Sequence, residues 1–165
     1  MAVTNGTGTA RGHGTAAGPG TFAALLLVAV CGSPAYADWA EANTDPSGAG
    51  GWFMRLLAWP SWQFGFDEVP GMAPGDLRAI LVVVLAALFL YLLPAAQTAR
   101  APGGLSQFFS GWAAYVLAGA FAALLGSLLG TDASLMTAFQ AVGTGATYGV
   151  FAGWIVGAAS LGGRA

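Results

Sequence analysis

Residues 141–157, AVGTGATYGVFAGWIVG, place Gly145, Gly149, Gly153 and Gly157 four residues apart. Residues at this spacing share one face of an α-helix, so the four glycines would form a groove along it. Lipid provides little hydrophobic drive between helices, and association there depends on the close backbone approach that small residues permit. The stretch therefore predicts a helix, at about 135–159, that packs closely on another helix in a membrane. We expect the aromatic residues off the stripe to face lipid or the first predicted span: Phe139, Tyr148, Phe151 and Trp154.

The preceding segment, at about 107–129, carries a second stripe of small residues with the same spacing. Its members are Ala114, Ala118, Ala122, Gly126 and Gly130. The two stripes can pack on each other within one chain as an antiparallel hairpin. Alternatively, one groove pairs with a neighbouring copy or a partner subunit. We treat eight residues as candidate helix-packing positions: Ala118, Ala122, Gly126, Gly130, Gly145, Gly149, Gly153 and Gly157.

An apolar run from Leu77 to Leu93 predicts another spanning helix earlier in the chain. It follows the turn Pro74-Gly75, and Asp76 is placed to cap it. Because this run rises only about 25 Å as a helix, we expect the helix to continue to about Gln97. Residues 77–165 are thus predicted to form an all-α bundle of three transmembrane helices, at about 77–97, 107–129 and 135–159.

The composition independently indicates a membrane protein. Of the 165 residues, 56% are hydrophobic and 7% are charged, whereas soluble domains carry about 25% charged residues. The net charge is −2 and the five basic residues are all Arg, which gives no basic surface for nucleic acid. The expected partners are therefore the lipid bilayer and other membrane proteins or copies of the same chain, and not nucleic acid.

Residues 1–37 are predicted to be a cleavable signal peptide. A region with Arg11 as its only charge precedes the apolar run Thr21–Val30, which is too short to span about 30 Å of hydrocarbon. Ser33–Ala37, SPAYA, then provides an A-x-A site for cleavage after Ala37. Two alternatives are an uncleaved N-terminal anchor, which the short run disfavours, and lipidation at Cys31, which the bulky Val30 before it disfavours.

Residues 38–76 are predicted to form an exported loop with an aromatic-rich segment. The stretch collects acidic residues, prolines and glycines, and its Gly51–Phe66 part is dense in Trp and Phe with Arg55 as the only charge. Such a segment next to a span suits the lipid headgroup layer. An aromatic platform for a ligand and packing on a partner are the alternatives. The interfacial candidates are Trp52, Trp59, Trp62 and Phe64.

The charges also predict an orientation. If residue 38 lies outside, Arg100 and Arg164 lie inside and all seven acidic residues lie outside. This matches the positive-inside rule, with Arg55 and Arg78 as exceptions on the exported side. We therefore expect a multi-pass protein of the plasma membrane, with the mature N-terminus outside and the C-terminus in the cytoplasm.

The residue inventory argues against an enzyme. Cys31 and His13 both lie in the predicted signal peptide, so the mature chain would contain no Cys, His or Lys. These residues activate nucleophiles, form Schiff bases, and bind zinc and haem. No Asp, Glu, Arg or His falls in the middle of a predicted span, which argues against a proton-driven transporter. We expect no catalytic residue, no metal site and no cofactor.

The leading functional hypothesis is a non-catalytic subunit that packs against other helices in a membrane complex for secretion, DNA transfer or envelope assembly. A signal peptide followed by apolar helices rich in small residues resembles conjugative pilins and secretion-channel subunits. Three short spans with the N-terminus outside resemble phage holins, so a homo-oligomeric pore is the first alternative. A lipid- or ligand-binding module that uses the aromatic segment is the second.

Overall fold

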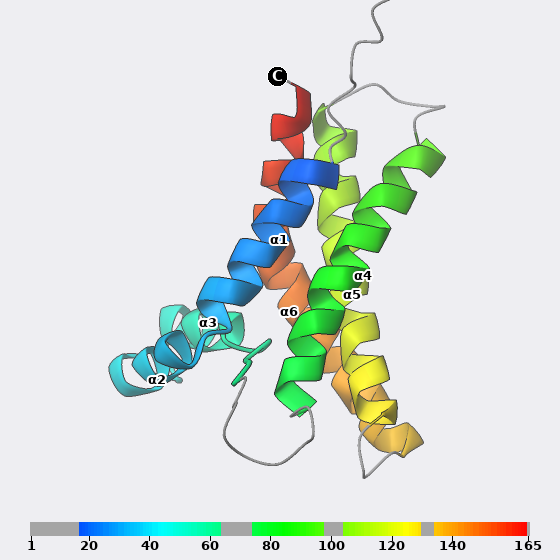
Figure 1. Ribbon diagram of the computed structural model, residues 1–165. Coiled ribbons are helices and arrows are strands. Elements are labelled where there is room, and N and C mark those ends of the chain that lie inside the picture. Colours follow the sequence, from blue (N-terminus) through cyan, green and yellow to red (C-terminus); the bar gives the residue numbers. More distant parts are fainter. Residues whose placement is uncertain (1–16, 64–73, 98–103, 130–133, 165) are drawn as a thin grey trace, which may run out of the picture.

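The computed structural model describes residues 17–63, 74–97, 104–129 and 134–164. Every regular element in these ranges is helical (Figure 1), so the prediction of an all-α fold is confirmed. The elements are α1 (Ala17–Cys31), α2 (Pro34–Asn43), α3 (Ala49–Leu57), α4 (Pro74–Gln97), α5 (Gly104–Leu128), α6 (Leu135–Ser160) and a final 3₁₀ turn, η1 (Leu161–Arg164).

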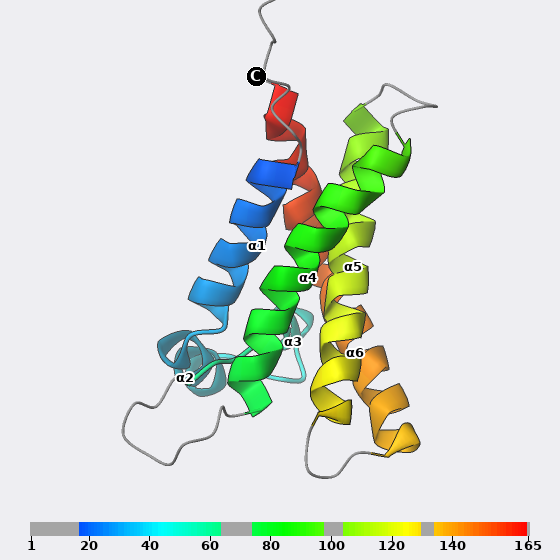
Figure 2. The same cartoon turned by 45° about the vertical axis from the view of Figure 1, so that its right-hand side comes forward.

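Four long helices lie side by side as a bundle. α4, α5 and α6 alternate in direction, and α1 packs on α4 and α6 (Figures 1 and 2). α5 and α6 share the most extensive contact in the bundle. The short helices α2 and α3 lie across one flank of the bundle, toward the end of α1. The start of α1 and the C-terminus lie together at the opposite end.

Two described helices are long and apolar enough to cross a membrane, namely α4 from Gly75 to Leu93 and α5 along its whole length. α1 and α2 meet at a bend of 62° and provide a third candidate if they are counted as one broken span. These helices are consistent with the membrane protein that the composition predicts. α6 is as long as α5 but is not among the candidates.

The N-termini of α4 and α6 differ in how polar side chains bind them. Ser134 caps α6 by accepting a hydrogen bond from the Thr137 N–H at 3.1 Å. Asp76 was expected to cap its helix, but α4 already begins at Pro74 and the Asp76 carboxylate instead accepts the Gln63 N–H at 2.6 Å. Asp76 is buried, so it ties the chain after α3 to the first turn of α4.

The apolar run of the predicted signal peptide forms α1, which belongs to the bundle core. Ala24, Leu27 and Val28 are buried with residues of α4, α5 and α6. A Cβ atom at Gly20 would lie 2.7 Å from Ser160 Oγ and 3.1 Å from Leu90 Cδ1. Glycine at this position therefore permits α1 to approach α4 and α6 closely.

The chain after the predicted cleavage point holds the end of α1. The Trp62 indole N–H donates to the Val28 carbonyl at 3.1 Å, and the Trp62 backbone N–H donates to the Gly32 carbonyl at 3.0 Å. The Val28 carbonyl already accepts the Gly32 N–H at 3.0 Å and gains the indole as a second donor, while the Gly32 carbonyl, just past the last residue of α1, gains a donor from the chain that follows. Ala37, after which cleavage was predicted, lies within α2.

If α1 is part of the folded unit, Gly20→Leu should destabilise the protein, because the new side chain would collide with Ser160 and Leu90. We expect a loss of about 1–3 kcal/mol in the free energy of unfolding. Gly18→Leu is the matched control, since a Cβ atom there meets nothing within 4 Å. Unfolding of both variants in detergent would be followed by circular dichroism. Equal stability of the two variants would show that α1 does not pack as described.

Candidate functional site

The glycine stripe of α6 meets α5 of the same chain along its whole length. A Cβ atom at Gly149 would lie 2.5 Å from Val116 Cα, and one at Gly153 would lie 2.7 Å from Trp112 Cδ1. At Gly157 the neighbour is the Phe108 carbonyl oxygen at 2.7 Å. At Gly145 it is the Gly119 carbonyl oxygen. All four glycines are buried, so the groove that they form is filled by α5.

The face of α5 that fills this groove is not the predicted stripe. The contacting residues include Gly111, Tyr115, Gly119 and Ala123, which are also four residues apart. α5 carries small residues on more than one face, so spacing alone did not identify the contact face. Because Tyr115 interrupts this second series, the series does not read as a continuous stripe of small residues.

The predicted α5 residues have three different outcomes. Ala118 and Ala122 are fully buried and belong to the core shared with α1, α4 and α6. A Cβ atom at Gly126 would meet nothing within 4 Å, so this glycine makes no close helix contact. Gly130 lies outside the described residues.

Side-chain hydrogen bonds fix the rotation of α5 against α6. The hydroxyls of Tyr115 and Tyr148 lie 2.7 Å apart, and both side chains are completely buried. The Trp112 indole N–H donates to the Val150 carbonyl at 2.9 Å. The expectation that Tyr148 faces lipid or the first predicted span was wrong in this respect, because its hydroxyl has its partner on α5. The other three aromatics off the stripe are exposed: Phe139, Phe151 and Trp154.

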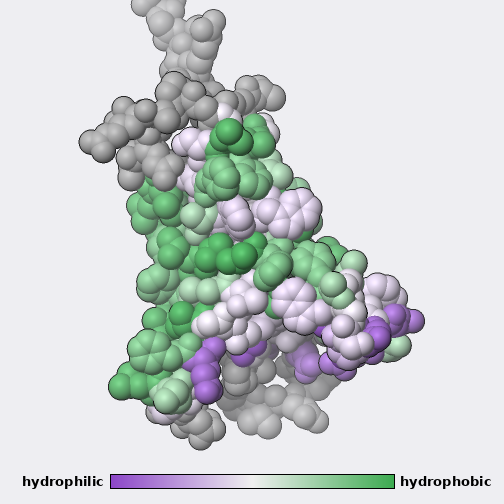
Figure 3. Space-filling view, turned by 180° about the vertical axis from the view of Figure 1, so that it is seen from behind, coloured by the Kyte–Doolittle hydropathy of each residue, from purple (hydrophilic) through white to green (hydrophobic). Residues whose placement is uncertain are grey.

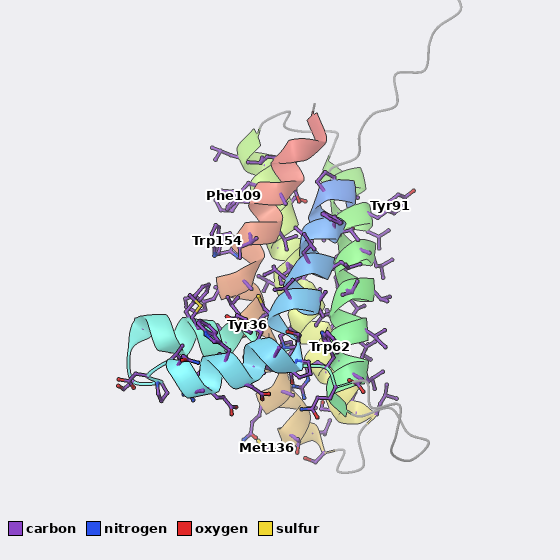
Figure 4. The ribbon with its side chains drawn as sticks, turned by 60° about the vertical axis from the view of Figure 1, so that its left-hand side comes forward. Tyr36, Trp62, Tyr91, Phe109, Met136 and Trp154 are labelled. Atoms are coloured by element: carbon purple, nitrogen blue, oxygen red, sulfur yellow. The ribbon has the colours of Figure 1, made fainter. Side chains whose placement is uncertain are left out.

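The aromatic segment packs on the flank of the bundle instead of lying apart from it. The Trp52 ring meets Phe151 of α6 edge to face, with 4.9 Å between ring centroids. The Trp59 ring lies 5.0 Å from Tyr148, and the Arg78 guanidinium of α4 lies 5.1 Å from the Trp59 ring centroid. Trp52 remains exposed, and Figure 4 shows Trp62 at the junction with α1. Phe64, the fourth interfacial candidate, lies outside the described residues.

A cavity of about 420 Å³ opens between α2 and α3. Its apolar wall includes Trp52, Leu56 and Trp59, and its polar wall includes Glu41, Arg55 and Ser61. Within the described ranges this flank also carries Asp45, whose pKa is lowered chiefly by hydrogen bonds from the Ser47 N–H and hydroxyl. The space-filling view shows the strongly polar residues gathered toward this end, while the rest of that face is largely apolar (Figure 3). The cavity therefore joins a charged surface to an apolar one.

Searches for related proteins find no match to a protein-family model, to a curated protein or to a solved structure. A functional assignment must therefore come from the chain's own geometry.

The stripe geometry predicts that Gly149→Leu will push α5 and α6 apart, because the nearest neighbour is backbone, which cannot move aside as a side chain can. We expect the free energy of unfolding to fall by roughly 3 kcal/mol or more, at or above the upper end of overpacking costs. Gly143→Leu in the same helix is the control, because a Cβ atom there meets nothing within 4 Å.

Thermal unfolding in detergent, followed by near-UV circular dichroism, would measure both variants. Size-exclusion chromatography with light scattering would show whether the oligomeric state changes. A Gly149→Leu protein as stable as Gly143→Leu, or one that loses only its oligomeric state, would contradict an intrachain role for the stripe.

Proposed function

We propose that this chain is a non-catalytic, multi-pass subunit of a membrane complex, whose task is to pack against other membrane proteins. The supporting observation is that α5 of the same chain fills the groove formed by the α6 glycines. The stripe then serves to build the subunit, and other surfaces remain for partners. The outward faces of α4, α5 and α6 carry large exposed apolar residues suited to lipid or to neighbouring helices, among them Val84, Leu92, Phe121 and Trp154.

The same geometry argues against a homo-oligomeric pore assembled through the glycine stripe. That groove has no room for a second copy, because α5 backbone atoms already fill it. The bundle interior is packed with apolar residues and the hydrogen-bonded tyrosine pair. A water-filled path would have to form between copies, and the exposed residues of the described helices give it largely apolar walls.

The proposed orientation places the α2–α3 end outside the plasma membrane and the C-terminus in the cytoplasm. Asp38, Glu41 and Asp45 belong to the α2–α3 end. Arg164 ends η1 at the opposite end, and Arg100 follows α4 in the sequence, which agrees with the positive-inside rule. α6 is proposed to cross the membrane beside α5 as the second arm of a hairpin. Its threonines suit this position, because the Thr144 and Thr147 hydroxyls donate to the Gln140 and Gly143 carbonyls of the same helix.

The N-terminal segment is proposed to remain as an anchor instead of being cut after Ala37. The sequence favours cleavage, but three observations support retention: the close approach of Gly20 to Ser160, the hydrogen bonds from Trp62 to the end of α1, and the position of Ala37 within α2. Proteolysis concentrates at exposed loop tips and is disfavoured within packed helices. A retained α1 would place its first turn on the cytoplasmic side, beside the end of α6, and leave the remaining orientation unchanged. It would also leave His13 and Cys31 in the chain, so the proposed non-catalytic role then rests on the helix packing and not on the loss of these residues.

The mass of the intact protein distinguishes these outcomes directly. We expect protein purified from membranes to retain residues 1–37, with Cys31 carrying no diacylglycerol. Intact-mass spectrometry on protein tagged at the C-terminus would measure this, and an Ala37→Leu variant, which removes the A-x-A site, should have the wild-type mass apart from the substitution. A species that begins at Asp38 in the wild type, and is absent in Ala37→Leu, would restore the signal-peptide interpretation.

The subunit role predicts stable partners and no channel. Protein isolated from native membranes in mild detergent should migrate as a complex that contains other membrane proteins in fixed proportion. The purified chain alone, reconstituted in a planar bilayer, should conduct no ions. Recovery of a homo-oligomer alone, together with conductance that Gly143→Leu preserves and Gly149→Leu abolishes, would instead support the pore.

A further inference from the structure

The cavity between α2 and α3 contains an arginine that is held in place but not neutralised. Arg55 Nε donates to Thr44 Oγ1 at 3.2 Å, and Nη2 donates to the Glu41 and Thr44 carbonyls at 2.9 and 2.8 Å. These bonds fix the guanidinium plane, and Nη1 has no acceptor among the described residues. Among the described residues no carboxylate forms an ion pair with Arg55, and Asp45, which interacts with it electrostatically, is itself bound by Ser47.

A second arginine lies beside the same aromatic wall. The Arg78 guanidinium lies over the Trp59 ring, and its Nη1 donates to the Trp59 carbonyl at 3.5 Å. It too has no carboxylate partner within the described ranges. Trp59 therefore lines the cavity with Arg55 and carries Arg78 on its ring, and neither arginine has a carboxylate partner in the part of the chain that the structure describes. Both lie on the side of the protein proposed to be exported. Such cations suit the phosphates of the lipid headgroup layer.

The apolar wall of the cavity leads toward the lipid-facing surface. Trp52 lines the cavity and contacts Phe151, which is 43% exposed on α6. Trp154, one turn further along α6, is 50% exposed, and Figure 4 shows it on the outside of the bundle. An amphiphile with its polar head in the cavity could thus extend its acyl chains along α6 without crossing a polar surface.

Glu41 makes the cavity selective by charge. Glu41 lines the same polar wall as Arg55 and is exposed, so the negative charge of its side chain disfavours a head group that is only negative. A phosphate beside an ammonium group satisfies both residues, since the phosphate can accept from Arg55 Nη1 and the ammonium can donate to Glu41. A choline head group carries positive charge but has no N–H to donate.

We propose that this cavity binds a phospholipid with an ethanolamine head group, with its phosphate on Arg55, its ammonium on Glu41 and its glycerol region against Trp52 and Trp59. The inference rests on the proposed membrane placement but not on the subunit role. The shared chemistry is a phosphate linked to a primary amine. Soluble phosphoethanolamine is therefore the alternative source of the same group.

The test uses the full purified chain in neutral detergent. Short-chain phosphatidylethanolamine, phosphatidylglycerol and phosphatidylcholine would each be titrated by isothermal calorimetry, and bound lipid would be counted by native mass spectrometry. We expect phosphatidylethanolamine to bind at one site and more tightly than the other two lipids. Arg55→Gln should weaken this binding about tenfold or more, the effect of losing one charge-assisted hydrogen bond.

Glu41→Gln should weaken ethanolamine-lipid binding and leave phosphatidylglycerol binding equal or stronger. Asp38→Asn is the matched control, because this exposed carboxylate of α2 does not line the cavity. Since Arg55 also ties α3 to the end of α2, melting curves would be recorded for every variant. Glu41→Gln keeps the test valid if Arg55→Gln does not fold, because only the Glu41 backbone carbonyl accepts from Arg55.

Two results would overturn the proposal. One is that all three lipids bind equally tightly and that neither Arg55→Gln nor Glu41→Gln changes their affinity, which would indicate an ordinary lipid shell. The other is binding of soluble phosphoethanolamine as tight as that of the lipid, which indicates a site for a soluble ligand. Neither result affects the subunit role, which depends on co-purifying proteins, and loss of those partners would leave lipid binding unchanged.

Discussion

The fold depends on the close approach of the α5 and α6 backbones. Where Gly145 faces Gly119 and Gly149 faces Val116, neighbouring backbone occupies the space of a side chain. In the proposed membrane placement, helices gain little from burying apolar groups, so dispersion contacts over such a short separation would supply much of the association energy. Polar bonds at the same interface, between Tyr115 and Tyr148, then select one rotation of the pair. Once this hairpin is fixed, it provides the surface on which the other helices pack.

The junction near the C-terminal end of α6 extends the same principle to three helices. Ser160 is buried, and its hydroxyl donates to the Val156 carbonyl of its own helix. The Ser160 backbone carbonyl accepts from the side-chain amide of Gln107 on α5. Glycines on two neighbouring helices, Gly20 of α1 and Gly111 of α5, leave the space that the Ser160 side chain occupies. A single small polar residue thus fixes the separation of three helices without leaving its own hydroxyl unsatisfied. α1 is consequently as closely fitted at this point as α5, although its sequence resembles a removable leader.

The aromatic segment connects this apolar bundle to its charged end. The Trp59 ring packs against Tyr148 of the core and lies under the Arg78 guanidinium of α4 in a cation–π contact. Trp59 also lines the cavity that holds Arg55. Tryptophan suits this position because its large ring packs against apolar groups and also interacts with cations. Of the two arginines that depart from the positive-inside pattern, Arg78 lies over the Trp59 ring and Arg55 lines the same cavity as Trp59. Their location suggests a local role in binding phosphate, separate from any role in setting the orientation of the protein.

The sequence by itself determined the helical class, the apolar character and the spacing of the α6 glycines, because composition and a four-residue period are properties of one segment. It did not determine which face of α5 meets that groove, since small residues recur on several faces and the choice depends on pairs such as Tyr115 and Tyr148, far apart in the chain. The inward position of Tyr148, the isolation of Gly126 and the packing of α1 likewise depend on neighbours that no local pattern specifies. The cavity around Arg55 arises only when α2 and α3 fold together, because its walls come from both helices and from the residues that follow α3. Tertiary structure made these choices because close packing depends on which side chains meet, and a sequence period specifies only their spacing along one helix.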